Sequence, residues 1–391
     1  MNASQVTIVV LNWNRRDDTL ACLASLGRAA LHGARVLVVD NGSSDGSVEA
    51  IRARFPAVDV VALPENRGYA GGCNAGIRVA LERDAEGVLL LNNDTEVAPD
   101  FLPPLLEAID STPDFAAASS AVLRLDRPEL LDVAYSEVQF GRRHAVHLVG
   151  VNALVGEGFD RRRQIPVATG CSVLLRAEAL RAIGLFDEAY FAYHEDVDWC
   201  LRAAKRGYRF LYEPYSRVYH HRSRSTVRTR PRRLASPQRE EPALPQAEPM
   251  SWNPVRAYLG ARNLVRLMRA HASKRDRAAF LAACARELPL ELVAIVFDRE
   301  GWLQLGRWGW RDAFRDATLG RHPTLATRAG GPLGRGLVRT ALLPYDLLVA
   351  TPRDVWRAWR TGQLEEYLAS VRGLRDGYLR RALPLERLGL R

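Results

Sequence analysis

The sequence is poor in two features that would settle its class at once, namely paired cysteines and long apolar runs. Its 391 residues include 5 cysteines at scattered positions without a CxxC pair, which argues against a disulfide framework and a thiolate zinc site. The longest apolar stretches, such as Leu288–Phe297, are interrupted by Pro or Glu and fall short of the roughly 20 residues of a membrane span. Met1–Asn14 lacks the pattern of a signal peptide. These absences predict a globular protein of the reducing cytoplasm.

Basic charge is distributed unevenly along the chain, whose formal net charge is +10. Residues 1–250 carry 30 Lys and Arg against 32 Asp and Glu, whereas residues 251–391 carry 25 against 13. The whole basic excess therefore lies in the last third. This division predicts two functional parts, one that carries out chemistry and one that faces something anionic.

Short apolar runs alternate with helical patterns in the first hundred residues. The runs are Val6–Leu11, Val36–Val39, Val58–Leu63 and Val88–Leu91, and the helical segments between them are Asp17–Ala30, Asp45–Phe55 and Gly71–Arg83. This alternation predicts an α/β fold with a mostly parallel sheet flanked by helices. Ligands of such sheets bind beyond the carboxyl ends of the strands.

The alternation fades beyond residue 115. The predicted strands there are Ala116–Leu125, Val167–Arg176, Tyr208–Tyr212 and Arg217–His220, with a helix at Glu195–Arg206 and an irregular stretch at 126–166. Arg222–Pro249, poor in apolar residues, is typical of a mobile loop or linker. Helices follow at Val255–Ala272, Asp276–Phe297, Thr351–Gln363 and Leu364–Leu383. We therefore predict a catalytic domain at 1–227, a linker at 228–250 and a helical, basic region at 251–391.

Polar residues at the end of the fourth apolar run suit a metal site. Asn92, Asn93 and Asp94 close the run, and Pro99 is expected to start the next helix. Mg²⁺ and Mn²⁺ take one or two carboxylates together with substrate phosphates, which a single Asp with amide neighbours can satisfy. A turn that caps the next helix explains the same residues without a metal. His220, at the end of a predicted strand, is a candidate second metal ligand.

Acidic residues cluster at the start of the predicted helix 195–206. Glu195, Asp196 and Asp198 occupy its first turn. The helix dipole favours acids at this position, but three carboxylates exceed what capping needs. An ionised carboxylate there can accept a proton from a hydroxyl group, which predicts a general base.

Two polar loops suit a nucleotide. The loop PENRGYAGGCNAGI (64–77) leads from a strand into a helix, where backbone N–H groups can approach a diphosphate. Its glycines lack the G-x-G-x-x-G spacing of a dinucleotide dehydrogenase. Asp40 ends the second apolar run, where it can bond a base or ribose, although Asn41-Gly42 also reads as a simple tight turn.

Seven segments resemble glycosyltransferase family 2, the inverting enzymes of GT-A fold, and cover residues 5–227 in family order. They are VTIVVLNWNR, VLVVDNGSSDGS, NRGYAGGCNAGI, LLLNNDTEVAPDFL, ATGCSVLLRAEAL, IGLFDEAYFAYHEDVDWCLRAAKRGY and VYHHRSRST. Among the branches of the family, the chain is most similar to bacterial rhamnosyltransferase-type enzymes of cell-surface polysaccharide synthesis, which also have a Tyr258…Arg262-Asn263 pattern. Where the family has D-x-D, this chain has Asn92 at the first position.

The resemblance implies roles for individual residues. Asp196 is the expected base, Glu195 its orienting neighbour, and Asp94 with His220 the expected ligands of Mg²⁺ or Mn²⁺. The nucleotide-sugar site is expected to comprise Leu11, Trp13, Asn14, Asp40, Asn66, Arg67, Gly71, Asn74, Asn92, Asn93 and Asp94. The acceptor or sugar pocket is expected to comprise Thr169, Gly170, Cys171, Tyr193 and Trp199.

The implied reaction is the inverting transfer of rhamnose or a similar hexose from a dTDP-, UDP- or GDP-sugar to a glycan or polyprenyl-diphosphate-linked saccharide. Processive members carry a Q-x-x-R-W motif soon after the acidic helix. Here Gln304, Arg307 and Trp308 lie about a hundred residues after Asp196, which argues against processive synthesis. The remaining alternatives are a nucleotidyltransferase and an inactive carbohydrate-binding protein of the same fold.

The basic last third contains Trp302, Trp308, Trp310, Trp356 and Trp359 beside many arginines. This composition favours an anionic membrane surface as partner, with a peripheral location at the inner face of the plasma membrane. Packing as a cap on the catalytic domain or as a homodimer contact is the alternative explanation. Nucleic acid is disfavoured because no binding motif accompanies the charge.

Overall fold

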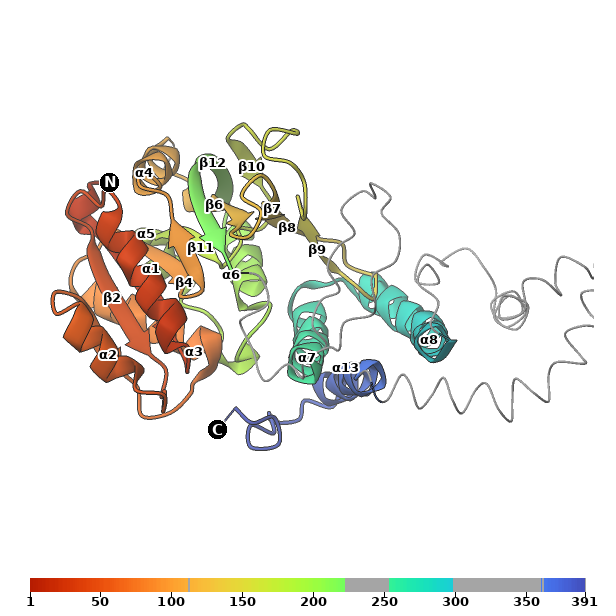
Figure 1. Ribbon diagram of the computed structural model, residues 1–391. Helices are drawn as coiled ribbons and strands as arrows, with labels where there is room; N and C mark the ends of the chain where they lie inside the picture. Colours follow the sequence, from red (N-terminus) through yellow and green to blue (C-terminus); the bar gives the residue numbers. More distant parts are fainter. Residues whose placement is uncertain (112, 222–252, 298–359, 361, 391) are drawn as a thin grey trace, which may run out of the picture. The chain divides into compact units, whose positions relative to one another are not determined.

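The computed structural model describes residues 1–111, 113–221, 253–297, 360 and 362–390 (Figure 1). The chain divides into a first unit, Met1–Gln139 with His144–Ser251 and Ala382–Arg391, and a second unit, Phe140–Arg143 with Trp252–Arg381. In the described ranges no helix is long and apolar enough to cross a membrane. The predicted linker, almost all of the predicted helix 351–363, the Q-x-x-R-W string and the tryptophans of the basic region lie outside these ranges.

Four parallel strands form one side of the main sheet, as the sequence predicts. They are β1 (Val6–Asn12), β2 (Arg35–Asp40), β3 (Asp59–Ala62) and β4 (Gly87–Asn92), in the spatial order β4-β1-β2-β3. Their central members are runs of Val, Leu and Ile because both faces of a parallel sheet are covered. All four carboxyl ends lie at one edge of the sheet, which positions the candidate site.

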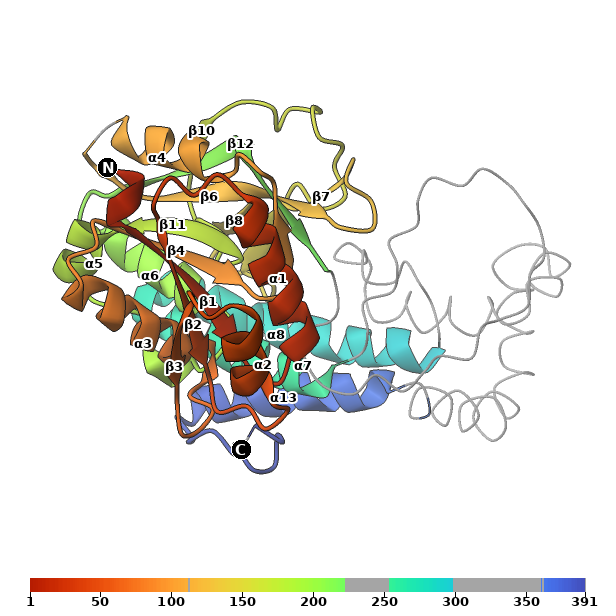
Figure 2. The same cartoon turned by 60° about the vertical axis from the view of Figure 1, so that its left-hand side comes forward.

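Helices cover both faces of this sheet (Figures 1 and 2). Alternate residues of a strand point to opposite faces, so Ile8 packs with α1 (Arg16–Arg28) and α4 (Leu102–Asp110), while Val9 faces α3 (Gly68–Glu82). The approach of α3 is close, since a side chain at Gly76 would collide with Val9. The helix α2 (Ser47–Arg54) packs beside α1.

Antiparallel and mixed strands complete the sheet. Its order continues from β4 through β11 (Ser172–Arg176), β6 (Phe115–Arg124) and β12 (Arg209–His220) to β10 (Arg163–Ile165). Two strands predicted after residue 207 are in fact the single strand β12, whose register shifts between Glu213 and Arg217. The predicted strand 167–176 begins only at Ser172.

Two further expectations about this half of the domain are wrong. Pro99 does not start a helix, because β5 (Thr95–Val97) first pairs with β12, and α4 begins at Leu102. The stretch 126–166 is not irregular throughout. It contains β7 (Leu131–Val133), β8 (Tyr135–Val138) and β9 (Val146–Val149) besides β10, which are too short to leave a clear alternating pattern.

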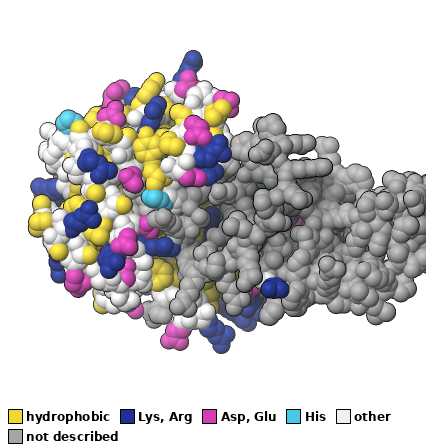
Figure 3. Space-filling model, viewed as in Figure 1, with side chains coloured by type: hydrophobic (Ala, Val, Ile, Leu, Met, Phe, Trp, Pro, Cys, Tyr) yellow, Lys and Arg dark blue, Asp and Glu magenta, His cyan; other side chains and the backbone are white. Residues whose placement is uncertain are grey.

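The helices after β11 carry the acidic motif. They are α5 (Ala177–Ile183), the short 3-10 helix η2 (Glu188–Tyr190) and α6 (Glu195–Ala204), and another 3-10 helix, η1 (Ala3–Gln5), precedes β1. Figure 3 shows acidic and basic side chains interspersed over the visible face of the first unit. This mixture agrees with the near-neutral charge balance of residues 1–250.

The second unit is helical where it is described. It contains α7 (Pro254–His271), α8 (Lys274–Phe297) and α13 (Gln363–Tyr378), the last ending five residues earlier than predicted. A Cβ on Gly377 would lie 2.6 Å from the Arg262 carbonyl oxygen, so α7 and α13 approach backbone to backbone. The Tyr258 hydroxyl donates to Asp376 Oδ2 at 3.0 Å and links the same two helices.

Candidate active site

The carboxyl ends of β1 and β2 form a buried polar cluster. Asn12 Nδ2 donates to Asp40 Oδ1 at 2.7 Å, and the Ser43 backbone N–H donates to Asp40 Oδ2 at 3.0 Å. Asn14 Oδ1 accepts from the Ser44 backbone N–H at 2.8 Å. Asp40, one of the most buried polar residues, therefore organises the loop after β2, and its remaining lone pairs are the ones left for a ligand.

Other residues predicted for the nucleotide-sugar site flank this cluster. Asn93 Nδ2 donates to Asn12 Oδ1 at 3.2 Å, which ties the end of β4 to the end of β1. The Leu11 side chain packs closely against Gly72 of α3, and Trp13 is half-buried. Leu11 thus packs between β1 and α3 and supports the helix.

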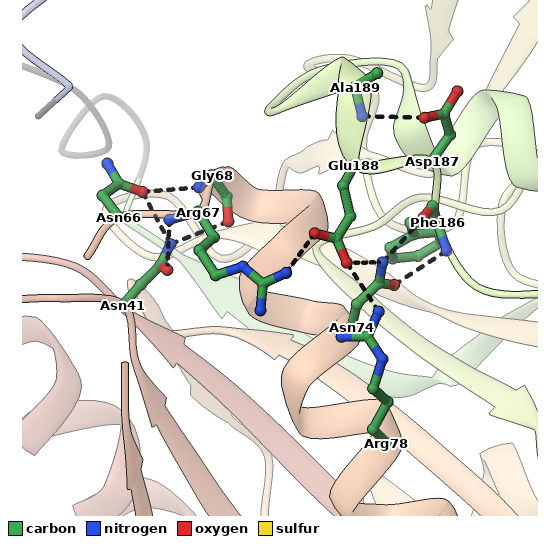
Figure 4. Close-up of polar contacts among 10 residues, drawn as sticks. All are labelled: Asn41, Asn66, Arg67, Gly68, Asn74, Arg78, Phe186, Asp187, Glu188 and Ala189. Atoms are coloured by element: carbon green, nitrogen blue, oxygen red, sulfur yellow. Dashed lines mark hydrogen bonds and ion pairs between the residues drawn. The ribbon is translucent and has the colours of Figure 1, made fainter. Parts of the chain in front are cut away.

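The loop before α3 is held by amide side chains (Figure 4). Asn41 Nδ2 donates to Asn66 Oδ1 and to the Gly68 carbonyl, both at 3.0 Å, and Asn41 Oδ1 accepts from the Arg67 backbone N–H at 2.9 Å. Gly68 has φ +72°, where a side chain would collide with the Phe191 carbonyl oxygen. The glycine motif therefore serves a close backbone contact with the segment that leads to α6.

Asn74 is a structural anchor, which corrects its expected role in binding the donor. Its amide donates to the Phe186 carbonyl at 2.9 Å and accepts from the Phe186 N–H at 3.0 Å, and the side chain is buried (Figure 4). Glu188 lies beside it and pairs with Arg67 at 2.7 Å and Arg78 at 2.9 Å. A Cβ on Gly71 would lie 2.7 Å from that of Arg67, so Gly71 leaves room for this arginine.

Asp94 and His220 meet beyond the end of β4. Pairing of β5 with β12 aligns His220 with Thr95, and His220 Nε2 lies 3.2 Å from Asp94 Oδ1 without hydrogen-bond geometry. On the other side of the ring, Nδ1 lies 2.7 Å from Asp132 Oδ2. Burial of His220 opposes its protonation, but the carboxylates of Asp132 and Asp94 outweigh burial and raise its pKa to about 10.

The atoms around Asp94 fit a hard divalent cation. In the described part of the chain, Asp94 Oδ2 and Asn92 Oδ1 are buried and have no hydrogen-bond partner, which is costly unless a ligand satisfies them. Carboxylate, amide and imidazole donors suit Mg²⁺ or Mn²⁺. Within the same described residues no three His, Cys, Asp or Glu side chains are arranged to hold a metal. A cation here would therefore need donor phosphates and water to complete its shell.

Asp196 lies at the start of α6 and is partly exposed. Its Oδ1 accepts from the Val197 N–H at 2.8 Å and its Oδ2 from the Gly170 N–H at 3.1 Å. Burial raises the pKa of Asp196 despite these two bonds, which favour the ionised form. The adjacent Glu195 is buried, and burial together with the charge of Asp196 raises its pKa well above the usual range. The pair thus keeps one carboxylate accessible for proton transfer.

The backbone that leads into α6 is strained. Phe191, Tyr193 and His194 have φ of 65°, 71° and 70°, a region that non-glycine residues seldom adopt. The Phe191 carbonyl accepts from the Ala70 N–H at 3.0 Å, which helps to hold this path. Residues in such conformations concentrate at functional sites, and these three immediately precede Glu195.

The loop 169–171 joins the two halves of the site. The Asn92 N–H donates to the Cys171 carbonyl at 2.9 Å, while Gly170 bonds Asp196 as above. Thr169 is buried, and within the described chain its Oγ1 has no hydrogen-bond partner. The ends of β4 and α6 are therefore held together through one short loop.

Trp199 does not line a pocket, contrary to expectation. Only 1% of it is exposed, its indole N–H donates to the Gly184 carbonyl at 2.9 Å, and its ring packs against Phe186 and Phe210. It lies three residues after Asp196, on nearly the same face of α6, but one turn further along the helix, where Phe186 and Phe210 enclose the ring. The tryptophan is a core residue that supports the helix.

Sequence reasoning did not single out Asp132, Glu188 and Tyr69. Asp132 lies in a stretch without a recognisable pattern, and Glu188 precedes the acidic motif by seven residues. Tyr69 stands inside the quoted NRGYAGG segment, but its hydroxyl donates to the Gly170 carbonyl at 2.7 Å, a contact about a hundred residues away in sequence. Only its place next to the glycines could have suggested a role.

Comparison with known proteins identifies the family of this domain. Residues 7–184 match the model of the family described as glycosyl transferase family 2. The chain is 29% identical over 239 residues to the N-acetylglucosaminyl-diphospho-decaprenol L-rhamnosyltransferase of Mycobacterium tuberculosis, covering 55% of this chain and 75% of that protein. It is 25% identical over 173 residues to the dTDP-rhamnosyl transferase RfbF of Shigella flexneri, covering 44% and 54%.

Among solved structures, the mannosyltransferase PcManGT of Pyrobaculum calidifontis, in complex with GDP-Man and Mn²⁺, aligns with a TM-score of 0.48 and 18% identity over 95% of this chain and 87% of that one. The α/β fold and the family match identify a glycosyltransferase domain within this chain. Its residues 7–184 form a glycosyltransferase family 2 domain, and the resemblance to bacterial rhamnosyltransferases is confirmed.

Proposed function

We propose that this chain is an inverting, metal-dependent enzyme that transfers rhamnose or a similar hexose from a nucleoside-diphosphate sugar to a hydroxyl of a glycan or lipid-linked saccharide. One observation carries the proposal. The loop 169–171 bonds both the end of β4, beside Asp94, and the carboxylate of Asp196. The candidate metal ligand and the candidate base are thereby held at fixed positions, as a single displacement requires.

The donor is a dTDP-, UDP- or GDP-sugar. The cluster of Asn12 and Asp40 is polar and rigid, which suits a base or ribose, and Arg67 supplies positive charge beside the loop before α3. Because Glu188 pairs with both Arg67 and Arg78, the group as a whole keeps one net positive charge. That charge favours a diphosphate.

Asp94 and His220 are the residues that would hold Mg²⁺ or Mn²⁺. The unpartnered Asp94 Oδ2 supports this assignment, and Asn92 Oδ1 lies at the end of the same strand. The bound cation would offset negative charge on the departing diphosphate. Asp132 orients the ring, because its bond to Nδ1 leaves Nε2 facing Asp94.

Asp196 acts as the general base. The acceptor oxygen forms a bond to the anomeric carbon while the bond from that carbon to the diphosphate oxygen breaks, and the hydroxyl proton passes to Asp196. Attack from the side opposite to the diphosphate inverts the anomeric configuration. Glu195 stays protonated to a higher pH than Asp196, because two adjacent carboxylates resist double ionisation.

The basic last third has a second role in this proposal. We infer that residues 251–391 bring the enzyme to an anionic membrane surface at the inner face of the plasma membrane, where a polyprenyl-diphosphate-linked acceptor resides. The charge balance of the sequence supports this inference. The mycobacterial relative is named for a decaprenol-diphosphate-linked saccharide, which supports an acceptor of this kind.

A donor screen tests the proposed reaction. The full chain is incubated with dTDP-rhamnose, UDP-N-acetylglucosamine or GDP-mannose, or with a nucleoside triphosphate and a sugar 1-phosphate, with and without Mn²⁺ or Mg²⁺. Thermal stabilisation, sugar release and pyrophosphate release are measured. Stabilisation and metal-dependent turnover by one donor are expected. Binding without turnover would favour an inactive carbohydrate-binding protein, and pyrophosphate release from a nucleoside triphosphate would favour a nucleotidyltransferase.

A further inference from the structure

Tyr69 contacts the loop that holds the proposed base. It is the second residue of α3 and half-buried, and its hydroxyl donates to the Gly170 carbonyl at 2.7 Å. Burial, and next the charges of neighbouring groups, raise the pKa of Tyr69 well above its usual value, so the phenol keeps its proton and remains a donor. Nothing in the proposed chemistry of donor, metal or base uses this hydroxyl.

The backbone of Gly170 needs a restraint of the kind that the Tyr69 hydroxyl provides. Its N–H donates to Asp196 Oδ2 at 3.1 Å, and a Cβ at Gly170 would itself lie 3.1 Å from that oxygen. Only glycine therefore lets the backbone approach the carboxylate without crowding, but glycine also has the greatest backbone freedom. The following residue, Cys171, is fixed to β4 through its carbonyl. Tyr69 fixes the carbonyl of Gly170 itself.

The other end of Tyr69 belongs to the proposed donor site. It follows Arg67 and Gly68, whose backbone is bonded by Asn41 and Asn66. Two hydrogen bonds in series thus connect the donor loop to the base, from the Tyr69 hydroxyl to the Gly170 carbonyl and from the Gly170 N–H to Asp196.

We propose that Tyr69 is a positioning residue, whose hydroxyl fixes the Gly170 backbone so that its N–H orients Asp196 and stabilises the ionised carboxylate. This inference rests on the proposed role of Asp196 as base. It assigns to the NRGYAGG segment a function in proton transfer in addition to donor binding.

The consequence for pH dependence has a definite sign. A hydrogen bond to the ionised form lowers a carboxyl pKa, so weakening the Gly170 bond raises the pKa of Asp196. The base is then protonated up to a higher pH, and the acidic limb of kcat moves upward. The titratable groups that face Asp196 are Glu195 and Cys200 on α6 and Tyr69 and Cys73 on α3. Burial raises the pKa of both thiols, so only Glu195 titrates together with Asp196.

Tyr69→Phe in the full chain tests the proposal, because it removes only the hydroxyl. Sugar release to water is measured over pH 4–9 with whichever of dTDP-rhamnose, UDP-N-acetylglucosamine or GDP-mannose the wild type turns over. We expect kcat to fall by about tenfold, a loss of the size of one neutral hydrogen bond, with the donor KM changed less than about twofold. The acidic limb should move up by roughly half to one pH unit.

Two variants make the result specific. Tyr212→Phe is the matched control, because the Tyr212 hydroxyl also donates to a backbone carbonyl, that of Phe159 at 3.2 Å. It should leave kcat and the limb unchanged. Gly170→Ala crowds Asp196 directly and should reproduce the kcat loss and the limb shift, which tests the bond from Gly170 to Asp196 even if Tyr69→Phe does not fold.

Unchanged kcat and an unchanged limb in folded Tyr69→Phe would overturn the proposal. So would an equal change in Tyr212→Phe, because it would show a general effect of losing a buried hydroxyl. Asp196→Asn, measured in parallel, separates a failure of the Tyr69 proposal from a failure of the base assignment. If Asp196→Asn is inactive while Tyr69→Phe behaves as wild type, the base assignment stands and the role of Tyr69 fails. If Asp196→Asn keeps full turnover, the base assignment itself fails.

Discussion

Asp132 Oδ2 lies 2.7 Å from His220 Nδ1, on the side of the ring away from Asp94. The carboxylate comes from β7, a short strand that pairs with β6, and reaches a histidine 88 residues later. Carboxylates in this relation to a ligating histidine fix its tautomer and orientation. With a pKa of about 10, the His220 ring is protonated, so a cation that bound at Nε2 would displace the proton there while Asp132 held the ring in place.

Asp132→Asn should weaken Mn²⁺ binding by about 10- to 100-fold, because the ring loses the partner that orients it. Binding of Mn²⁺ to the full chain by calorimetry, in the presence of a nucleoside diphosphate, measures the effect without turnover. Asp126→Asn is the matched control, since Asp126 lies in the same segment but is exposed and pairs with Arg124. Equal affinity in wild type and Asp132→Asn would remove Asp132 from the metal site.

Glu188→Gln should destabilise the first unit by about 1 kcal/mol at neutral pH, because Arg67 and Arg78 lose their shared partner. Partial burial raises the pKa of Glu188, but bonds from Arg78 and Asn74 and the charge of Arg67 outweigh it, so the pKa lies below its ordinary value. The stabilisation is therefore present above the ordinary pKa of about 4.3 and is lost as the pH falls through the lowered value.

Thermal unfolding at pH 7 and at pH 3 measures this difference. The gap in Tm between wild type and Glu188→Gln should be clear at pH 7 and small at pH 3. Glu157→Gln, at an exposed loop position of the same unit, should show no gap at either pH. A gap that is equal at both pH values would mean that the charge of Glu188 does not stabilise the fold.

The full chain should bind vesicles that contain anionic lipid at low salt and dissociate from them as salt rises, because the basic excess lies in residues 251–391. Sedimentation with vesicles of phosphatidylglycerol and phosphatidylcholine, compared with phosphatidylcholine alone, measures this preference. Absence of the protein from both pellets at low salt would leave the cap or the homodimer contact as the role of this region.

The parallel half of the fold could be predicted from the sequence because its strands are continuous apolar runs followed by polar turns. The second half could not, since β7, β8 and β10 are three or four residues long, too short to show an alternating pattern, and β10 is defined by pairing with the distant strand β12. The same reason explains the error at Pro99. Thr95–Val97 forms a strand only because β12 passes beside it.

The site shows the same division. Asp94, Asp196 and His220 follow motifs with a chemical pattern, and sequence reasoning named all three. Asn74 and Trp199 lie in the same motifs, yet their side chains are bonded or packed internally, which no local pattern reveals. Tyr69 was missed for the same reason, because its proposed role depends on a contact with Gly170 that only the tertiary fold creates.

The central claim is that Asp196 removes the acceptor proton. Asp196→Asn keeps the size of the side chain and an oxygen for the Val197 or Gly170 N–H, but it cannot take up the proton. Asp198→Asn is the matched control in the same turn, since Asp198 is buried and pairs with Arg202. It should lower Tm and leave the folded enzyme active.

Turnover of the identified donor by Asp196→Asn, measured together with its affinity for the nucleoside diphosphate, tests this claim most directly. We expect kcat to fall by at least about 100-fold, with nucleotide affinity within about twofold of the wild type. Wild-type turnover in this variant would contradict the account.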